Sequence, residues 1–315
     1  MAMPMNPSAL NEKRLGYFSE TVRSGSMRAA AEKLDVEASV VSRQIQQLEE
    51  DVGAVLLERR GRGVVPTEAG LLVMALCEER SLGEDTLRHR LWELQGLERG
   101  ELRIVVGEGF LPALMDGVVH AFTRRYPRIL VTVDTMGASE AVREVSAGRA
   151  NLGIALSAPV DPGVHVVRER HQPVCVVASP QHAVAKGKRP IALADLAGYA
   201  LALTTPGSGL RMLAQTAEQA DGVRLSPSFT SNSVDALKRH VIATDSITFL
   251  TRFAIRQELA RGELIARRTS NTVFEAAHAQ LFVQQDRRAS AALQALLKLA
   301  ESARFLANPP ATFAR

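Results

Sequence analysis

Apolar residues recur at helical spacing in the first part of the chain, interrupted by short breaks. Between Leu15 and Val22 they fall at three- and four-residue steps, which predicts one buried face of a first helix. A glycine then ends this helix, and Ser26 is a suitable N-cap for a second one. The second helix has a flat apolar side formed by Ala29, Ala30 and Leu34.

A third helix is predicted after a short break at Asp35-Val36. Its buried side carries Val41, Ile45 and Leu48. Its other side carries short polar and basic side chains, namely Ala38, Ser39, Ser42, Arg43 and Gln46. A helix with one core face and such an opposite face suits insertion into the major groove of DNA.

A short hairpin with a basic tip is predicted over residues 56–65. Two apolar runs flank a glycine-hinged turn, and the turn carries Arg59, Arg60 and Arg62. Arginines at such a tip can reach phosphates or a narrow minor groove while the third helix occupies the major groove.

Taken in order, these segments resemble the winged helix-turn-helix of LysR-type transcriptional regulators. The resembling segments are Ala29-Ala30 with Leu34, Val41-Ser42-Arg43-Gln44-Ile45, Leu48-Glu49, Leu56 with Glu58-Arg59, and Thr67-Glu68-Ala69-Gly70. The resemblance implies that the third helix contacts bases, while Arg28 and the arginines of the hairpin hold the DNA backbone. For any single arginine, the alternative is an ordinary solvated residue on a helical core.

The start of the third helix departs from the family pattern. Relatives often carry Ser or Thr followed by Gln there, whereas this chain has Glu37 and Ala38. The base contact that the family makes through Gln therefore does not carry over, and Ala38 can offer only an apolar contact, such as one with a thymine methyl. Sequence specificity is expected from Ser39, Ser42, Arg43 and Gln46 instead.

The charge of the chain is informative only through its placement. The whole chain carries a formal net charge of +4, yet residues 15–70 contain seven Lys and Arg against nine Asp and Glu, a net charge of −2. The basic character of this segment is therefore local. It is gathered in Arg28, Arg43, Arg59, Arg60 and Arg62.

Length and composition indicate a globular protein of two or three domains. The chain has 315 residues, of which 46% are hydrophobic and 23% charged. It shows neither an apolar run that could cross a membrane nor a secretion signal, so we expect no membrane contact. Cys77 and Cys175 lie far apart in the sequence, which fits buried thiols in a reducing cytoplasm rather than a disulfide framework.

A long helix is predicted from Thr67, a suitable N-cap, to about residue 95. Its leucines recur at three- and four-residue steps and are Leu72, Leu76, Leu87, Leu91 and Leu94. A helix of roughly 27 residues spans about 40 Å, more than a small winged-helix domain can cover. We therefore favour pairing with the same helix of a second subunit over packing on its own domain.

After Gly100, predicted strands and helices alternate, which indicates mostly parallel sheets covered by helices. Strands are expected at 102–106, 129–133, 152–156, 174–178, 200–203, near 229, at 247–250 and at 280–283. Helices are expected at 110–125 and 139–147, after 207, from 234, and at 288–304. This pattern gives two similar α/β units, which the family resemblance identifies as a two-lobed, periplasmic-binding-protein-like (type 2) effector domain.

The predicted fold class is therefore α/β, with an N-terminal, mostly helical winged helix-turn-helix and a long linker helix. The expected boundaries are 1–66 for the DNA-binding domain, 67–96 for the linker and dimerisation helix, and 97–315 for the effector-binding domain. Within the last, the first lobe is expected at about 101–168 and 268–315, and the second at about 169–267.

Four predicted strand-to-helix junctions carry small or polar residues. In two-lobed α/β domains the ligand binds at the carboxyl ends of strands, next to helix N-termini that favour anionic groups. The junction residues are Glu108, Gly109, Phe110, Ala138, Ser139, Thr204, Thr205, Ser208, Asn232 and Ser233. We expect a small carboxylate-bearing effector, with Glu108 favouring a cationic or hydroxyl group on the same ligand. Taken singly, each residue is better explained by a cap or a turn, and only the four junctions together favour a site.

No catalytic or metal-binding pattern is found in the sequence. Phosphate-loop, HExxH and CxxC motifs are absent, and His165, His171 and His182 do not have metal-ligand spacing. We therefore expect neither an enzyme nor a cofactor. A solute-binding protein would need an export signal and would leave the first hundred residues without a role, and an enzyme with an accessory DNA-binding domain would need a catalytic set.

The resemblance implies a cytoplasmic transcriptional regulator that binds double-stranded promoter or operator DNA as a dimer, and further as a dimer of dimers. Two subunits would place their recognition helices in successive major grooves, about 34–36 Å apart. A small-molecule effector bound between the lobes would shift their arrangement, alter the DNA bend and change the recruitment of RNA polymerase.

Overall fold

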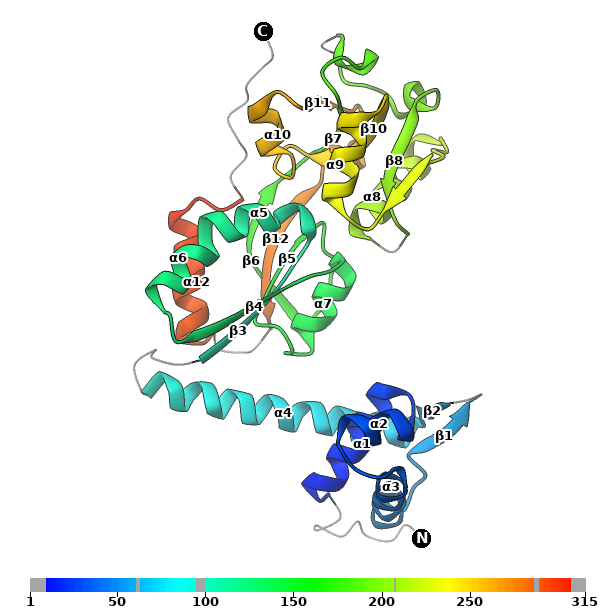
Figure 1. The fold of residues 1–315 in the computed structure, drawn as a ribbon, viewed down its shortest axis with the longest axis vertical. Helices are drawn as coiled ribbons and strands as arrows, with labels where there is room; N and C mark the ends of the chain where they lie inside the picture. The colour runs from blue at the N-terminus through cyan, green and yellow to red at the C-terminus, as the bar shows by residue number, and fades with distance from the viewer. Residues whose placement is uncertain are drawn as a thin grey trace. The chain divides into compact units, whose positions relative to one another are not determined.

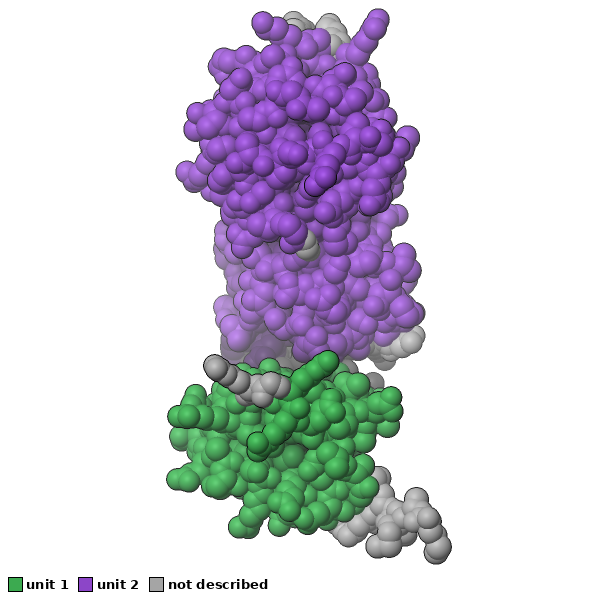
Figure 2. All heavy atoms as spheres, turned by 90° about the vertical axis from the view of Figure 1, so that its right-hand side faces the viewer, with its two compact units in different colours: residues 1–88 green, residues 89–315 purple. Residues whose placement is uncertain are grey.

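The computed structural model of the chain describes residues 10–60, 63–94, 100–187, 189–206, 208–285 and 289–306 (Figure 1). The chain divides into two compact units, Met1–Arg88 and His89–Arg315 (Figure 2). Arg62, at the tip of the predicted hairpin, lies outside the described residues.

Unit 1 contains the predicted series of helices followed by a hairpin. Its elements are α1 (Glu12–Ser24), α2 (Met27–Lys33), α3 (Ala38–Val52), β1 (Leu57–Arg60), β2 (Gly63–Pro66) and the start of α4 (Glu68–Leu94). The predicted caps are confirmed: Ser26 Oγ accepts the N–H of Ala29, and Thr67 Oγ1 accepts the N–H of Gly70. The predicted core face of α3 is confirmed as well, because all three of its apolar residues are buried.

The buried side of α2 differs from the predicted one. Ala30 and Ala31 are buried, whereas Leu34 is 38% exposed. The reason is that α2 ends at Lys33, so Leu34 follows the helix as its C-cap instead of extending its apolar side.

The hairpin is fixed to the helices at two points. Glu49, in the last turn of α3, accepts hydrogen bonds from the backbone N–H groups of Leu56 (2.7 Å) and Leu57 (3.1 Å). The N–H of Val64 in β2 donates to the carbonyl oxygen of Gly25 at 2.9 Å. This approach requires glycine at position 63, because a Cβ there would lie 2.6 Å from the Gly25 oxygen.

Unit 2 contains two five-stranded sheets. The first has the order β4-β3-β5-β12-β6, and the second has the order β11-β7-β10-β8-β9. The strands of the first sheet are β3 (Gly100–Val106), β4 (Ile129–Thr135), β5 (Leu152–Leu156), β6 (Val164–His171) and β12 (His278–Gln284). The strands of the second sheet are β7 (Val174–Ala178), β8 (Ala200–Thr204), β9 (Phe229–Ser231), β10 (Ser246–Thr251) and β11 (Ile265–Arg268). We call the first sheet with its helices the first lobe, and the second sheet with its helices the second lobe.

Both sheets are mixed, so the prediction of mostly parallel sheets was wrong. In the first sheet β3 runs parallel to β4 and β5, but β12 runs antiparallel to β5 and β6. In the second sheet β7 runs antiparallel to β10 and β11. The chain crosses between the sheets from β6 to β7 and from β11 to β12, and all pairings of these four strands are antiparallel.

Helices cover both faces of each sheet (Figure 1). The helices of unit 2 are α5 (Leu111–Leu114), α6 (His120–Arg125), α7 (Ala138–Ser146), α8 (Gly209–Asp221), α9 (Val234–Ala243), α10 (Arg256–Arg261), α11 (Thr272–Glu275) and α12 (Ala291–Ser302). On the first sheet, α5, α6 and α12 form a core around Phe122, and α7 covers the opposite face through Val142. On the second, α8 and α11 cover one face and α9 with α10 the other.

Three predicted segments differ in detail. The helix expected at 110–125 is divided by a π-helical segment, Met115–Val119, which accommodates an extra residue in the turn. The last helix begins only at Ala291, because Ser290 caps it by accepting the N–H of Leu293. Phe274 of α11 packs in the core of the second lobe, so the chain returns to the first sheet at β12, later than residue 268.

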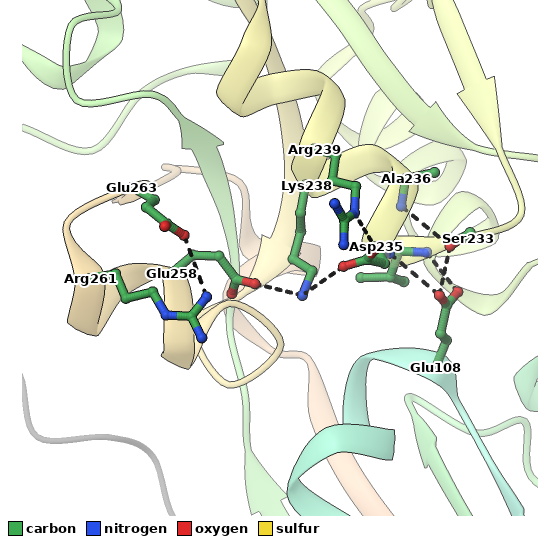
Figure 3. Close-up of polar contacts among 10 residues, drawn as sticks. Glu108, Ser233, Asp235, Ala236, Lys238, Arg239, Glu258, Arg261 and Glu263 are labelled. Carbon is green, nitrogen blue, oxygen red and sulfur yellow. Dashed lines mark hydrogen bonds and ion pairs between the residues drawn. The ribbon is translucent and has the colours of Figure 1, made fainter.

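A buried ion pair joins α9 to α10. Lys238 is 9% exposed and Glu258 is 8% exposed, and Lys238 Nζ lies 2.8 Å from Glu258 Oε1 (Figure 3). The other carboxylate oxygen of Glu258 has no hydrogen-bond partner in the described part of the chain. Each charge is therefore tolerated in the interior chiefly because the other compensates it.

We expect Lys238→Met to lower the free energy of unfolding by about 3–5 kcal/mol, because the carboxylate of Glu258 would stay buried without a cation. The matched control is Arg239→Met, which removes the next cation of α9 from an exposed pair with Asp235 and should change stability little. Urea denaturation followed by circular dichroism measures the free energy of unfolding of both variants. Equal decreases in the two variants would contradict the claim that the buried pair contributes more to stability than the exposed one.

Candidate DNA-binding surface and effector cleft

The outer face of α3 is open along its length. Val41, Ile45 and Leu48 are at most 1% exposed. The five residues predicted on the opposite face are all exposed, and they are Ala38, Ser39, Ser42, Arg43 and Gln46. The helix therefore presents a polar and basic surface, which is the arrangement that base contact in the major groove requires.

The side chains of this surface differ in how far they are engaged within the protein. Gln46 Nε2 donates to Glu50 Oε1 at 3.2 Å, and Arg28 Nε lies 3.7 Å from Glu32 Oε1. Arg43, in contrast, makes no hydrogen bond or ion pair with any described residue and is exposed. Its guanidinium, the only cationic group of α3, is consequently available for an outside partner. Glu37 is the N-cap of α3 but forms no side-chain cap, as its poor capping chemistry predicts.

The hairpin brings more arginines to the same unit. Arg59 and Arg60 are exposed at the end of β1, where β1 pairs with β2 in antiparallel register. The sequence analysis did not assign a role to Glu49, whose two hydrogen bonds attach the start of this hairpin to the end of α3.

A cleft of about 560 Å³ lies between the two lobes of unit 2. Of the ten residues predicted at the four junctions, all except Ser233 line it. Ser233, the N-cap of α9, stands in the sequence between two lining residues, Asn232 and Val234. The four junctions, which follow β3, β4, β8 and β9 and are far apart in the sequence, thus line one cavity.

The N-termini of α7, α8 and α9 reach this cleft but are capped differently. Ser208 caps α8 by accepting the N–H of Arg211 at 3.1 Å, and it donates to Thr204 Oγ1 at 2.7 Å. Ser233 caps α9 by accepting the N–H of Ala236 at 3.3 Å. No side chain caps α7, whose N-cap is Gly137. The first-turn N–H groups of α7 are therefore the most available donors at the cleft.

The starts of α7 and α8 touch across the cleft. A Cβ on Gly209 would lie 2.9 Å from the Cβ of Ala138, which is closer than side-chain carbons normally approach. Glycine at this position lets the two helix N-termini converge on the same end of the cavity.

Glu108 also lines the cleft, and its side chain is engaged with the start of α9 in the second lobe (Figure 3). Its carboxylate accepts hydrogen bonds from Ser233 Oγ at 2.8 Å and from the N–H of Val234 at 2.6 Å. Nearby, a hydrogen bond from Arg239 holds the pKa of Asp235 below its usual value, so this second carboxylate is charged at neutral pH.

Two charged residues in the first turns of α7 were not among the predicted site residues. Glu140 and Arg143 both line the cleft and are exposed. Arg143 lies four residues after Ser139, which places the two side chains on neighbouring positions of one helix face, and this spacing could have signalled it. Arg143 makes no ion pair with a described residue.

Neither metal chemistry nor a membrane span is evident within the described ranges. They contain no group of three or more His, Cys, Asp or Glu side chains placed to hold a metal ion, and no helix with the length and apolar character to cross a bilayer. Cys175 is buried, and burial raises the pKa of its thiol to about 11, so it remains protonated as a core residue.

Two family models match the chain. One is described as a bacterial regulatory helix-turn-helix protein of the lysR family and matches residues 13–71. The other is described as the LysR substrate binding domain and matches residues 95–304, more than half of the chain.

Curated relatives agree with these matches. The chain is 28% identical over 250 residues to the HTH-type transcriptional activator CmpR of Synechocystis sp., an alignment that covers 78% of this chain and 81% of the relative. It is 30% identical over 260 residues to the RuBisCO operon transcriptional regulator of Allochromatium vinosum, covering 80% and 83%. These relatives are transcriptional regulators, not enzymes.

Solved structures share the fold. Full-length CbnR in complex with its target DNA matches 93% of this chain and 100% of its own length, with a TM-score of 0.60 and 21% identity. Full-length OxyR from Pseudomonas aeruginosa matches 94% of this chain and 95% of its own length, with a TM-score of 0.66 and 16% identity.

The helix-turn-helix of unit 1, the cleft of unit 2 and the two family matches agree. The chain belongs to the LysR family of transcriptional regulators, and it is a DNA-binding regulator with a substrate-binding effector domain.

Proposed function

We propose that this regulator reads promoter DNA with the outer face of α3 and that a small carboxylate-bearing molecule, bound in the cleft, modulates this reading. The observation that carries the proposal is the division of α3 into a buried apolar edge and an exposed polar face. A helix of this kind, followed by a basic hairpin, has the surface needed for a major-groove contact with flanking backbone contacts.

The availability of each side chain suggests its role. Arg43 is exposed without a partner among the described residues, so we assign it the strongest base contact, supported by Ser39 and Ser42. Gln46 would first have to leave Glu50. Backbone contacts are assigned to Arg28, Arg59, Arg60 and Arg62, the last on sequence grounds alone.

The effector is proposed to place its carboxylate at the start of α7. The uncapped N–H groups there, the hydroxyl of Ser139 and the guanidinium of Arg143 together provide hydrogen-bond donors and positive charge. The start of α9 is closed to such a group by Glu108, and the apolar lining of the cleft includes Phe110 and Leu156.

Assembly through α4 completes the proposal. Leu72 is 76% exposed, Leu87 58% and Leu91 50%, so this side of α4 has no apolar cover within the described part of one chain. We propose that it pairs with α4 of a second subunit, that the dimers associate further into a tetramer, and that effector binding changes the DNA bend and the recruitment of RNA polymerase in the cytoplasm. The proposed domains are the DNA-binding domain at 1–66, the linker and dimerisation helix at 67–96, and the effector-binding domain at 97–315.

We expect Arg43→Ala to weaken binding to DNA from the promoter region of its own gene by about 1–3 kcal/mol, because one charged base contact is lost. Gel-shift titration at fixed salt measures the change. The matched control is Lys13→Ala, which removes one positive charge from the exposed surface of α1. Lys13 precedes Arg14, which pairs with Asp51 near the C-terminal end of α3.

An Arg43→Ala midpoint equal to that of the wild type would refute the assignment of Arg43. A loss of the same size in Lys13→Ala would show that only the total charge matters. Failure of the wild-type protein to bind any promoter fragment would count against the proposed function as a whole.

A second prediction concerns the cleft. For a carboxylate found by isothermal titration of a panel against the wild-type protein, we expect Arg143→Gln to reduce the affinity by about 1.5–3 kcal/mol, the size of a hydrogen bond to a charged group. Arg125→Gln, an exposed arginine at the end of α6, is the control. Equal affinities in the two variants would move the carboxylate away from α7, and a folded wild-type protein that gives no heat with any carboxylate would argue against this effector class.

A further inference from the structure

We propose that Glu108 is a built-in anion of the cleft, which occupies the N-terminus of α9 and clasps the two lobes together. The inference rests on the proposed function, since it concerns the same cleft. It adds the residue that decides which end of the cavity can take an anionic group of a ligand.

The contacts of Glu108 cross from one lobe to the other. Glu108 follows β3 of the first lobe, in the short helical turn Glu108–Phe110. Its two carboxylate oxygens accept hydrogen bonds from Ser233 Oγ (2.8 Å) and from the N–H groups of Val234 (2.6 Å) and Asp235 (3.4 Å) in the second lobe (Figure 3). A carboxylate held by two backbone N–H groups and a hydroxyl at a helix start is bound as a ligand anion would be.

These contacts are not needed to start the helix. Ser233 already caps α9 by accepting the N–H of Ala236, as an ordinary N-cap does. Glu108 is separated from Ser233 by 125 positions in the sequence. Glu108 is therefore a second cap of α9, and its contacts connect the two lobes in addition to capping the helix.

The two cationic side chains of α9, Lys238 and Arg239, are already paired with carboxylates of the protein. Arg239 and Lys238 are both bonded to Asp235, and Lys238 is also paired with the buried Glu258. Within the described part of the chain, no Lys or Arg side chain pairs with Glu108. A ligand carboxylate placed here would meet a resident carboxylate without a compensating charge.

The clasp thus makes the two helix starts at the cleft unlike. At the α7 end, uncapped N–H groups and Arg143 accept an anion. At the α9 end the anion position is taken by the protein. A ligand with a single anionic group fits this division, and a dianion that spans the cleft must first displace Glu108.

The clasp can be removed without removing all contact between the lobes near it. Phe110 in the first lobe packs against Phe253 in the second, with ring centroids 5.5 Å apart, and Arg256 lies 3.9 Å from Asp116. These contacts do not involve Glu108, so we expect Glu108 variants of the full-length protein to fold.

The test is hydrogen exchange at the start of α9 together with rescue by formate, a carboxylate that fits the space left by Glu108→Ala. In this variant we expect the N–H of Val234 to exchange about tenfold faster than in the wild type, the factor for one hydrogen bond of about 1.4 kcal/mol. Sodium formate should slow the exchange again and raise the melting temperature relative to sodium chloride at equal ionic strength.

Two further variants separate the clasp from other effects. Glu108→Gln keeps the side-chain volume without the charge, so exchange at Val234 should be faster but should not respond to formate. Asp195→Ala removes an exposed carboxylate of the second lobe that does not line the cleft, and neither exchange at Val234 nor its formate response should differ from the wild type.

Unchanged exchange at Val234 in both Glu108 variants would overturn the clasp, and so would an equal formate response in Glu108→Ala and Asp195→Ala. Should Glu108→Ala not fold, exchange in Glu108→Gln decides alone. The measurement uses neither DNA nor effector, so its failure leaves the promoter-binding prediction for Arg43 standing, and failure of promoter binding leaves the clasp intact.

Discussion

The burial of one edge of α3 is the constraint on which the DNA-binding unit depends. Val41, Ile45 and Leu48 share a core with Phe18 of α1 and with Leu56, at the start of the hairpin. Because a helix turns by a fixed angle per residue, anchoring these three positions determines the direction of every other side chain in α3. Ser42 and Arg43 face outward as a consequence of packing on the inside.

In unit 2 the corresponding constraint is the topology of two facing sheets. The helical segments that follow β3, β4, β8 and β9 all start where a strand ends, so their polar starts converge on one cavity. This convergence is a general property of such folds. What is particular to this chain is the unequal capping: α7 is open, α8 is capped by its own serine, and α9 is capped by both Ser233 and a glutamate from the other lobe.

Sequence reasoning located most of these elements because the signals were local. Helical spacing placed α3, and the serine and threonine caps placed the starts of α2 and α4. The alternation of strands and helices led to ten predicted effector-site residues, of which nine line the cleft. It did not anticipate that Leu34 lies beyond the end of α2, or that the crossing strands run antiparallel, because helix ends and strand direction depend on tertiary contacts. The bond from Glu108 to α9 was also out of reach, since nothing in either segment specifies a partner so distant in the sequence.

The attachment of the hairpin to α3 through Glu49 has a consequence for the operator. Since the same carboxylate holds the backbone of Leu56 and Leu57, the recognition helix and the hairpin keep a fixed separation. In the proposed DNA contact, one subunit consequently spans a fixed length of double helix between α3 and the hairpin. Any variation in the number of base pairs that the assembled regulator tolerates has to be absorbed between half-sites rather than within one.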